Sequence, residues 1–395
     1  MRFMATALTI STVLGLHQFQ QEWPTDEAWL SIKVWYPFPD MRTFERRERY
    51  PISRENELAT FQGELEYYRT NNCFPVDIFG QRIVNIYKNI NLQVVVGKQC
   101  NYSCSFCIEN DQISSGVTKI PNGIFAEIFG DLIRAYRAQG VLPWISITGG
   151  EPTLFPERLA LIYRALNDWG IAERANVNTN GINLKCLEPM KGIRINLSRH
   201  HYCEGKSEEI FGGRCSNYDI GESTVLQCVM MKGYIDSVAE IKRYMDFYGG
   251  IGAKGFSFRG LSTLDAGKQY EKEVNYSAAK AIDFFAIVNE VTNDPDFEFL
   301  QQKIGDHYWF EIYKYKGKIV RFTYSNFEFL RQVETEERKN GQWFSRATIL
   351  RETGKVYAGW TYDINEIVPT RWARLDGLKH SDILFSVKRN NIKER

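Results

Sequence analysis

The sequence predicts an α/β fold: a partial, open barrel of six strand–helix units with an extension at each end. Two observations lead to this prediction. Between about residues 89 and 262, short runs of strand character alternate with segments of helical periodicity, which is typical of a parallel sheet. Cysteine-rich and glycine-rich motifs follow the first two strand candidates, and in β/α barrels the carboxyl ends of the strands carry the active site.

Composition limits the classes of function. A hydrophobic fraction of 44% and a charged fraction of 25% are ordinary for a globular protein. The 49 basic and 48 acidic residues nearly cancel, so nothing indicates binding to nucleic acid or to an anionic membrane. Eight cysteines without a small-domain disulfide pattern favour a reducing compartment. We therefore expect a cytoplasmic protein that binds neither nucleic acid nor membrane.

Residues 1–88 form an N-terminal extension whose role the sequence does not indicate. The apolar run from Ala5 to Leu16 weakly resembles the core of a signal peptide. It lacks a clear cleavage site, so we interpret it as a strand or helix of the extension. Met41 to Glu57 is rich in charge and is interpreted as surface or linker.

Residues 89–262 supply the six strands of the predicted barrel. The strand candidates are Asn91–Val96, Trp144–Thr148, Ala175–Asn178, Ile193–Leu197, Val225–Met230 and Gly255–Phe258. Apolar residues at helical spacing predict helices from Ile124 to Tyr136 and from Leu159 to Leu166. Ser237, followed three residues later by Glu240, has the spacing of a capping box and predicts the start of another helix.

Residues 263–395 are predicted to form an α+β extension that covers the barrel. Ser277 to Val291 has the pattern of a helix, and Glu334 to Lys339 that of a solvated helix face. The segments interpreted as antiparallel strands are His307–Phe322, Trp343–Arg351 and Lys355–Trp360, with a turn at Thr353-Gly354.

Three cysteines stand at C-x3-C-x2-C spacing directly after the first strand: Cys100, Cys104 and Cys107. Thiolates are soft ligands for iron–sulfur clusters and for zinc. Three ligands would leave one iron of a four-iron cluster open for chemistry. A structural zinc site usually has a fourth Cys or His at a short interval, and none follows before Gly123. A zinc site and unpaired structural thiols remain the alternatives.

A second motif, Thr148 to Thr153, follows the second strand and contains Gly149, Gly150, Glu151 and Pro152. Adjacent glycines let the backbone approach a ligand closely, and a carboxylate beside them can accept hydrogen bonds from an ammonium group. The order of the two motifs, on consecutive strand ends, places both at one edge of the predicted barrel.

These motifs resemble those of the radical S-adenosylmethionine (radical SAM) enzymes. The three cysteines, with Phe106 before the third, match that family's cluster loop, and Gly149 to Pro152 match its methionine-binding segment. The resemblance covers about residues 90 to 262 and is strongest to the branch containing the GTP cyclase of molybdenum-cofactor synthesis. It continues through Val177–Gly181, Asn196–Ser198, Gln227–Gly233 and Phe256–Arg259.

The resemblance implies a role for each matching residue. Cys100, Cys104 and Cys107 would ligate a [4Fe-4S] cluster whose open iron binds the amino and carboxylate groups of S-adenosylmethionine. The backbone near Phe106 would contact the adenine, and Gly149–Pro152 would receive the methionine ammonium. The remaining cofactor contacts implied are Asn178, Asn180, Ser198 and Gln227.

The implied activity is reductive cleavage of S-adenosylmethionine to a 5′-deoxyadenosyl radical, which removes hydrogen from a small-molecule or peptide substrate. An electron donor such as flavodoxin or ferredoxin is implied as a partner. Two departures from the cyclase branch stand out: Gln227 replaces its typical Asn, and no cysteine follows Cys228. The second departure excludes an auxiliary C-terminal cluster by ligand count and argues against GTP cyclisation. A non-catalytic iron–sulfur redox sensor and a zinc-binding structural module are the alternative functions.

Four residues are candidates for substrate contact: His200, His201, Cys203 and Arg259. The histidines follow the fourth strand and either form a polar loop or take part in substrate contact and proton transfer. Cys203 lies in the same loop and could face the radical. Arg259 ends the sixth strand and could pair with a carboxylate or phosphate, or with a structural acidic partner.

Overall fold

The computed structural model describes residues 49–71, 73–87, 90–107, 120–216, 220, 224–261, 271–360 and 362–367. All of them lie in one compact unit, residues 40–395. Across these residues the main sheet has twelve strands in the order β15-β14-β13-β3-β4-β5-β6-β7-β8-β11-β10-β9. A second, three-stranded sheet has the order β1-β2-β12.

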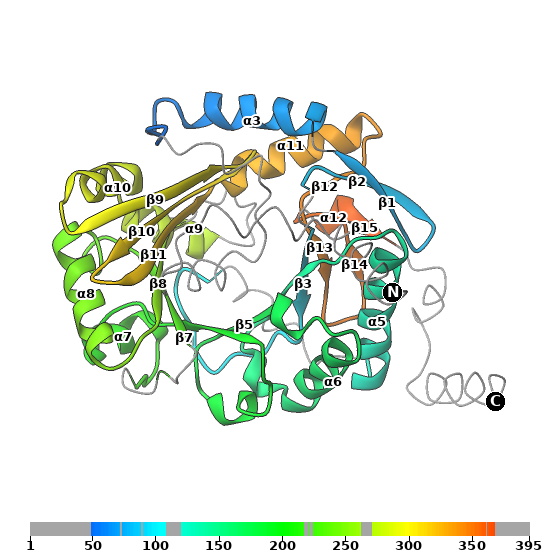
Figure 1. The fold of residues 1–395 in the computed structure, drawn as a ribbon, viewed down its shortest axis with the longest axis horizontal. Coiled ribbons are helices and arrows are strands. Elements are labelled where there is room, and N and C mark those ends of the chain that lie inside the picture. Colours follow the sequence, from blue (N-terminus) through cyan, green and yellow to red (C-terminus); the bar gives the residue numbers. More distant parts are fainter. Residues whose placement is uncertain are drawn as a thin grey trace, which may run out of the picture. The chain divides into compact units, whose positions relative to one another are not determined.

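Six parallel strands in sequence order form the centre of the main sheet, which confirms the predicted α/β class. They are β3 (Asn91–Val95), β4 (Trp144–Thr148), β5 (Ala175–Thr179), β6 (Arg194–Ser198), β7 (Thr224–Met230) and β8 (Gly255–Gly260). Each pairs in parallel with the next. Figure 1 shows them following a curve, with the helices on its outer side.

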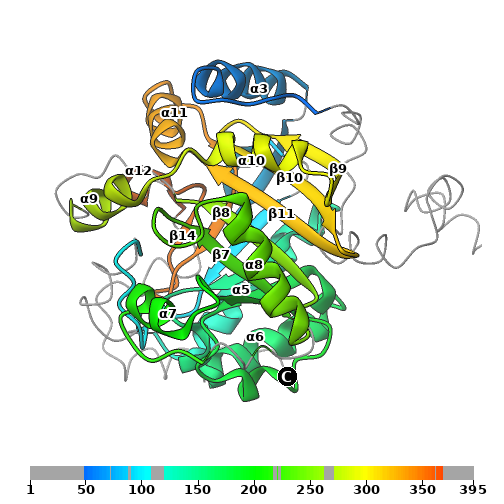
Figure 2. The same ribbon diagram turned by 90° about the vertical axis from the view of Figure 1, so that its left-hand side faces the viewer.

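Helices connect most of these strands. They are α5 (Asn122–Ala138), α6 (Pro156–Asp168), α7 (Glu204–Phe211) and α8 (Val238–Gly250). The predicted cap of α8 is confirmed, because the Ser237 hydroxyl accepts a hydrogen bond from the Glu240 amide at 3.3 Å. Between β5 and β6 only a short 3-10 segment, η3 (Leu184–Leu187), is present. Figure 2 shows α8 and α6 packed along the outer side of the strands.

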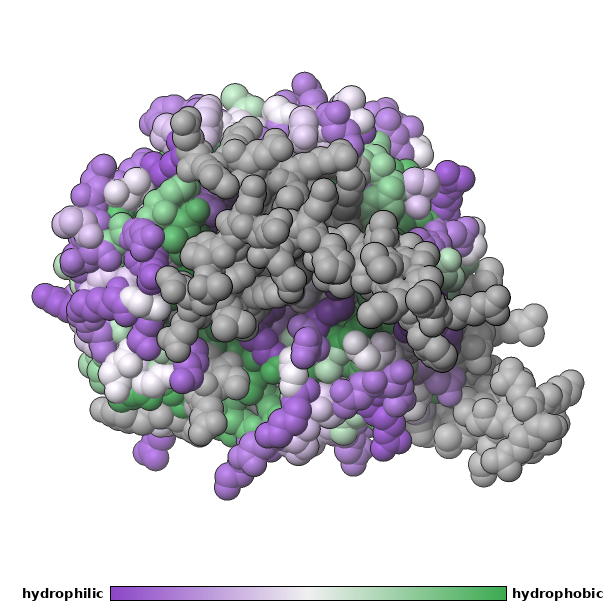
Figure 3. Space-filling view, in the orientation of Figure 1, coloured by the Kyte–Doolittle hydropathy of each residue, from purple (hydrophilic) through white to green (hydrophobic). Residues whose placement is uncertain are grey.

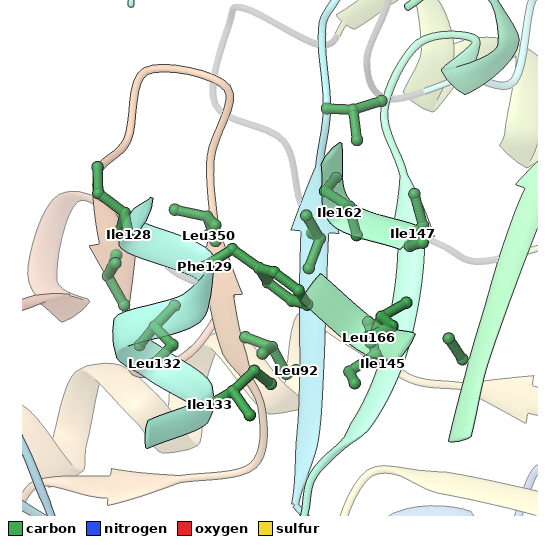
Figure 4. Packing of buried hydrophobic residues seen from close by; sticks show 14 of the residues in the cluster. Leu92, Ile128, Phe129, Leu132, Ile133, Ile145, Ile147, Ile162, Leu166 and Leu350 are labelled. Carbon is green, nitrogen blue, oxygen red and sulfur yellow. The ribbon is translucent and has the colours of Figure 1, made fainter. Parts of the chain in front are cut away.

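The core between helices and sheet explains why the strands are apolar on one face. Phe129, Leu132 and Ile133 of α5 and Ile162 and Leu166 of α6 point toward the strands (Figure 4) and are fully buried. Burying a large apolar side chain contributes roughly 1.5–3 kcal/mol. The opposite face of the sheet, called the inner face below, is therefore free to carry polar residues.

The C-terminal residues extend the main sheet at both edges. On one side are β9 (Phe297–Ile304), β10 (Tyr308–Tyr315) and β11 (Lys318–Ser325); on the other are β13 (Thr348–Leu350), β14 (Val356–Tyr357) and β15 (Glu366–Ile367). The antiparallel pairing predicted between Trp343–Arg351 and Lys355–Trp360 is confirmed by β13 and β14. The strands β9, β10 and β11 also pair antiparallel with one another. In addition β11 pairs in parallel with β8, and β13 with β3. Strand pairing thus crosses the boundaries predicted near residues 88 and 262, whose status as domain limits stays a prediction.

Two C-terminal predictions differ in detail. The run predicted as one strand, His307–Phe322, is a hairpin that turns at Lys316 and Gly317, which have φ of 45° and 79°. The predicted helix Ser277–Val291 is two helices, α9 (Glu271–Lys280) and α10 (Phe284–Asn293). Asp283 separates them because its carboxylate caps α10, accepting from the Ala286 amide at 3.0 Å.

The prediction of a solvated face at Glu334–Lys339 holds for Glu336 and Lys339, which are exposed, and is wrong for Glu334 and Glu337. This segment belongs to α11 (Phe327–Lys339), which packs against α3 (Glu57–Asn71). Glu334 and Glu337 are 0% and 1% exposed. Glu337 pairs with the Arg346 guanidinium at 2.8 Å, and Glu334 accepts from Asn365 at 3.0 Å. Partners distant in sequence satisfy these charges, so local pattern alone indicated the wrong environment.

The small sheet is formed by β1 (Phe74–Ile78), β2 (Gln81–Asn85) and β12 (Phe344–Ser345).

The run Ala5–Leu16 lies outside the described residues. Among the helices that are described, none combines the length and apolarity needed to cross a bilayer. Hydrophilic residues cover most of the coloured surface on the face drawn in Figure 3.

Candidate active site

The cysteine loop begins after β3 and packs backbone against backbone on the segment that follows β4. The Gly150 amide donates to the Gly97 carbonyl at 2.9 Å, and the Glu151 amide donates to the Gln99 carbonyl at 2.7 Å. A Cβ atom on Gly150 would lie 2.3 Å from the carbonyl oxygens of Lys98 and Gln99. Only glycine permits this approach, so the contact fixes the start of the cysteine loop.

The neighbouring glycines are restricted by the same contact. A Cβ on Gly149, whose φ is +149°, would lie 2.3 Å from the Gly97 carbonyl oxygen. One on Gly97 would lie 2.1 Å from the Phe155 ring. Pro152 is buried and opens the short 3-10 helix η1 (Pro152–Leu154). The glycines that the sequence attributed to ligand approach are thus needed first for packing the two loops together.

The three candidate ligands form no disulfide and have intermediate exposure: Cys100, Cys104 and Cys107. The Cys107 amide donates to the Cys104 carbonyl at 3.0 Å, and the Tyr102 amide donates to the Cys100 sulfur at 3.4 Å. Burial, and after it the neighbouring thiols of Cys107 and Cys100, raise the pKa of the Cys104 thiol. The three side chains are therefore close enough to influence one another electrostatically.

This donor set fits an iron–sulfur cluster in kind and number. Clusters are held by cysteine thiolates, and three of them come here from one loop. Among the described residues, no group of three or more His, Cys, Asp or Glu side chains is gathered tightly enough for a single metal ion. The cysteines of a four-iron cluster bind different iron atoms, so they lie farther apart than the ligands of one ion.

Glu151 is a buried tie between the ends of β4 and β5. Glu151 is 1% exposed. One carboxylate oxygen accepts from the Thr153 amide and hydroxyl at 2.9 and 2.6 Å and from the Thr179 hydroxyl at 2.6 Å. The other accepts from the Asn180 amide at 2.7 Å. The chain itself therefore satisfies this carboxylate.

Asn180 connects the Glu151 carboxylate to the cysteine loop through further contacts. Its side-chain Nδ2 donates to Asn101 Oδ1 at 2.8 Å and lies 3.7 Å from the Cys100 sulfur. Its carbonyl accepts from the Arg199 guanidinium at 2.8 Å. Asn180 thus links the ends of β5 and β6 to a candidate ligand.

A network of amide and hydroxyl groups occupies the inner face of the central strands. Asn178 donates to Ser146 Oγ at 2.9 Å and accepts from Asn196 at 2.9 Å and from Gln227 at 3.5 Å. Asn176 also donates to Ser146, at 3.2 Å. This network brings together two of the sequence-predicted cofactor residues, Asn178 and Gln227.

The sheet register extends this surface across four strands. Ser198 of β6 pairs with Gln227 of β7, Gln227 with Ser257 of β8, and Ser257 with Arg321 of β11. Residues in register on neighbouring strands point to the same face. We call these four residues the polar row.

Aromatic residues pack under the cysteine loop. The His200 ring lies 5.2 Å from the Phe106 ring and 4.9 Å from the Phe211 ring, which in turn lies 4.8 Å from Tyr102. The Val229 amide donates to His200 Nδ1 at 3.1 Å. Burial, and then the charge of Arg199, lower the pKa of His200 to about 3. His200 is accordingly a neutral, buried support of the loop at neutral pH.

His201 and Cys203 lie at the start of α7. His201 is 1% exposed, and its Nδ1 accepts from the Cys203 amide at 2.8 Å. Burial, followed by the charge of Lys206, lowers the pKa of His201 to about 4. Cys203 is exposed. The substrate roles suggested for these residues stay predictions.

Arg259 lies on the inner face of β8. Phe256 and Phe258 pack against Tyr244 of α8, so Arg259, between Phe258 and Gly260, points to the opposite face. Solvent reaches part of the side chain. Surrounding protein, and then the charge of Arg321, still lower the pKa of the guanidinium to about 10. The Arg259 side chain is therefore exposed to solvent on the inner face and stands near the guanidinium of Arg321.

The sequence prediction missed several site residues. Ser146, Asn176, Ser257 and Arg321 all line the inner face, and none of them was a candidate. A signal was present, because polar residues alternate with apolar ones along β4 and β5. For Arg321 no signal existed, since its strand joins the sheet from 60 residues downstream.

Comparisons with known proteins give similarities at the level of solved structures. No family model and no curated protein matches the chain. SuiB of Streptococcus suis bound to its precursor peptide SuiA is similar with 17% identity and a TM-score of 0.42, over 59% of this chain and 49% of SuiB. This chain therefore spans about half the length of SuiB.

Two further solved structures are similar. A radical SAM methyltransferase from Sphaerobacter thermophilus has 18% identity and a TM-score of 0.35, over 52% of this chain and 74% of that one. TYW1 with a lysine-pyruvate adduct has 16% identity and a TM-score of 0.34, over 52% and 73%. All three TM-scores lie below 0.5, so these likenesses by themselves assign no activity to this chain.

Proposed function

We propose that this chain is a radical SAM enzyme. The observation that supports the proposal most directly is the backbone contact between the two motifs, in which Gly150 and Glu151 donate to the carbonyls of Gly97 and Gln99. This contact holds a loop with three cysteines that form no disulfide beside a glycine segment, at the carboxyl ends of β3 and β4. A cluster and the ligand that it activates need such adjacency.

A [4Fe-4S] cluster with bound S-adenosylmethionine would supply the difficult chemistry, namely one-electron reductive cleavage of the cofactor and removal of hydrogen from substrate. The chain itself would bind and orient the cluster and the cofactor. Cys100, Cys104 and Cys107 would hold the cluster, and Asn180 would orient Cys100 through its contact with the sulfur.

The segment after β4 offers carbonyl oxygens rather than a free carboxylate to the methionine ammonium. Glu151 already accepts four hydrogen bonds from the chain. Among the described residues, no hydrogen bond uses the carbonyl of Gly149 or Gly150. We therefore assign ammonium binding to these two carbonyls and a positioning role to Glu151.

The inner face would bind the rest of the cofactor. Asn178 and Gln227 present amide groups there, and Ser198 lies in register with Gln227. Amide and hydroxyl groups suit the ribose hydroxyls and the methionine carboxylate. The backbone beside Phe106, which His200 supports, would contact the adenine.

The finer assignments are part of the same proposal. The substrate is a small molecule or a peptide, and the electron comes from a donor of the flavodoxin or ferredoxin class. Likeness to the branch with the GTP cyclase rests on residues 90–262, while the lack of cysteine after Cys228 argues against cyclisation itself. A redox sensor and a zinc module remain as alternatives with the same ligands.

Production of 5′-deoxyadenosine tests the proposal. The full chain, reconstituted anaerobically with iron and sulfide, is given dithionite and S-adenosylmethionine. We expect 5′-deoxyadenosine from the wild type and from Cys73→Ala, a free thiol outside the loop. Cys104→Ala should lose both the brown colour and the product.

The alternatives give different outcomes. An intact cluster whose EPR signal changes with S-adenosylmethionine, but which yields no product, would indicate a sensor and reject the enzyme. Zinc as the metal in protein purified without reconstitution, with no iron taken up on reconstitution, would indicate a structural module.

A further inference from the structure

Two arginines lie side by side on the inner face where the C-terminal strand β11 joins β8. Register places Ser257 beside Arg321 and Arg259 beside Thr323. On β11, Phe322 and Tyr324 pack against Phe284 of α10, so Arg321 and Thr323 point to the inner face, as Ser257 and Arg259 do. Neighbouring strands are about 4.8 Å apart, so the two guanidinium groups share one surface.

The two arginines differ in how they are held. Arg321 donates from Nε and Nη2 to the Ser257 hydroxyl at 3.3 and 3.2 Å, and Ser257 is 1% exposed. Arg259 makes no hydrogen bond or ion pair within the part of the chain that the structure describes. Its five N–H donors therefore lie on the inner face without a described acceptor.

The hydroxyl of Thr323, which lies beside Arg259 in the strand pair, is unsatisfied. Thr323 Oγ1 is buried and has no hydrogen-bond partner. Leaving a buried polar atom unpaired costs free energy, and so does placing two like charges side by side. Both costs fall on the same small area of β8 and β11. An oxyanion bound there would reduce both, because it accepts from guanidinium and hydroxyl groups and offsets their charge.

We propose that Arg259, Arg321 and Thr323 form an oxyanion site that binds the carboxylate or phosphate of the substrate. The site continues the polar row, with Gln227 on β7 and Arg321 two strands farther on. That offset is about 10 Å at the usual strand spacing. A ligand anchored by the arginines would thus lie beside a cofactor held at Ser198 and Gln227. Calling the ligand a substrate rests on the proposed function; anion binding itself does not.

Anion titration of the full, cluster-reconstituted chain without reductant tests the site. Calorimetry with inorganic phosphate and, separately, with glutarate should show saturable binding of at least one. Binding of that anion should weaken at least tenfold in Arg259→Gln and only partly in Arg259→Lys. Arg164→Gln, which changes an exposed arginine on α6, should bind as the wild type does. Binding of phosphate alone would indicate a phosphorylated substrate, and binding of glutarate alone a carboxylate.

Several outcomes would overturn the proposal. The proposal fails if neither anion binds to the wild type. It also fails if Arg259→Gln binds the anion as tightly as the wild type does. An anion that displaces S-adenosylmethionine would assign the arginines to the cofactor carboxylate instead. If Arg259→Gln does not fold, Thr323→Val provides a second test, because the change keeps a similar volume and removes only the hydroxyl. It should weaken anion binding at least threefold. Because the titration involves no turnover, it can fail while 5′-deoxyadenosine still forms, and the reverse.

Discussion

The Thr179 hydroxyl donates to Glu151 Oε1 at 2.6 Å and joins the end of β5 to the end of β4. The other oxygen of Glu151 accepts from the Asn180 amide, and the Asn180 side chain lies 3.7 Å from the Cys100 sulfur. A continuous series of polar contacts therefore runs from a buried carboxylate to a candidate cluster ligand.

Replacing Glu151 by Gln should loosen this series. All four partners of the carboxylate are donors, so the new amide NH2 must face at least one of them. We expect a loss of about 1–3 kcal/mol in the free energy of unfolding and less iron per chain after reconstitution. Urea denaturation and iron analysis measure both. Glu188→Gln, at an exposed position, is the control, and unchanged iron in Glu151→Gln would contradict the role.

Gly150→Ala should disrupt the contact between the two loops. Its Cβ would lie 2.3 Å from two backbone carbonyl oxygens, which cannot move without shifting the cysteine loop. We expect lower iron content and loss of 5′-deoxyadenosine formation. Gly63→Ala is the matched control, because nothing lies within 4 Å of its Cβ in the middle of α3. That change should stabilise the chain by about 0.5–1 kcal/mol. Full cluster loading in Gly150→Ala would show that the contact is dispensable.

The parallel strands could be predicted because each side of the sheet imposes its own pattern. Trp144–Thr148 was predicted with its observed bounds, since apolar Ile145 and Ile147 alternate with polar neighbours. Pairing between distant segments leaves no such local pattern. The parallel pairing of β11 with β8 and of β13 with β3 could not be inferred, and neither could the burial of Glu337 by Arg346.

Prediction of the candidate site divides in the same way. Cysteine spacing identified the loop, because three ligands for one cluster come from one short segment. The contacts that the site residues make could not be predicted from the sequence. Glu151 has the expected position, but its carboxylate is satisfied by Thr153, Thr179 and Asn180, a fact that depends on how β4 and β5 end side by side.

Arg346→Met should destabilise the chain strongly. The Arg346 side chain is 1% exposed and donates to Glu337 through both Nη atoms at 2.8 Å, and to Asp306 through Nε. Removing it leaves the buried Asp306 without its arginine and leaves Glu337 with only Arg69, which costs roughly 3–5 kcal/mol. Arg164→Met at an exposed position should change the free energy of unfolding by less than about 0.5 kcal/mol. Equal denaturation midpoints for the two variants would refute this account of the buried charges.

Asp306 should contribute to the loss of stability in acid. Burial alone would raise its pKa, but the charges of Arg346 and His307, with the hydrogen bonds of His307 and Tyr87, hold the pKa below its ordinary value of 3.8. A lowered carboxylate pKa gives stability that is present above the ordinary value and is lost as pH falls below it. Asp306→Asn should therefore be less stable at pH 7 and lose less further stability below pH 4. Parallel acid profiles for the variant and the wild type would contradict the assignment.

His201 should also make stability depend on pH, but through a group that is neutral in the folded chain rather than charged. Burial, and then the charge of Lys206, lower its pKa to about 4, with Glu240 opposing, so the folded chain keeps the imidazole neutral. The unfolded chain takes up a proton below the ordinary value of 6.5 and thus binds more protons between pH 4 and 6.5. Stability must then rise with pH across that window, by at most about 1.4 kcal/mol per pH unit for one proton. His201→Gln should remove this contribution, so urea midpoints measured at pH 4.5, 5.5 and 6.5 should change less than in the wild type. Because the Cys203 amide donates to His201 Nδ1, the variant should also be less stable at pH 7; an unchanged pH slope would show that His201 titrates normally in the folded chain.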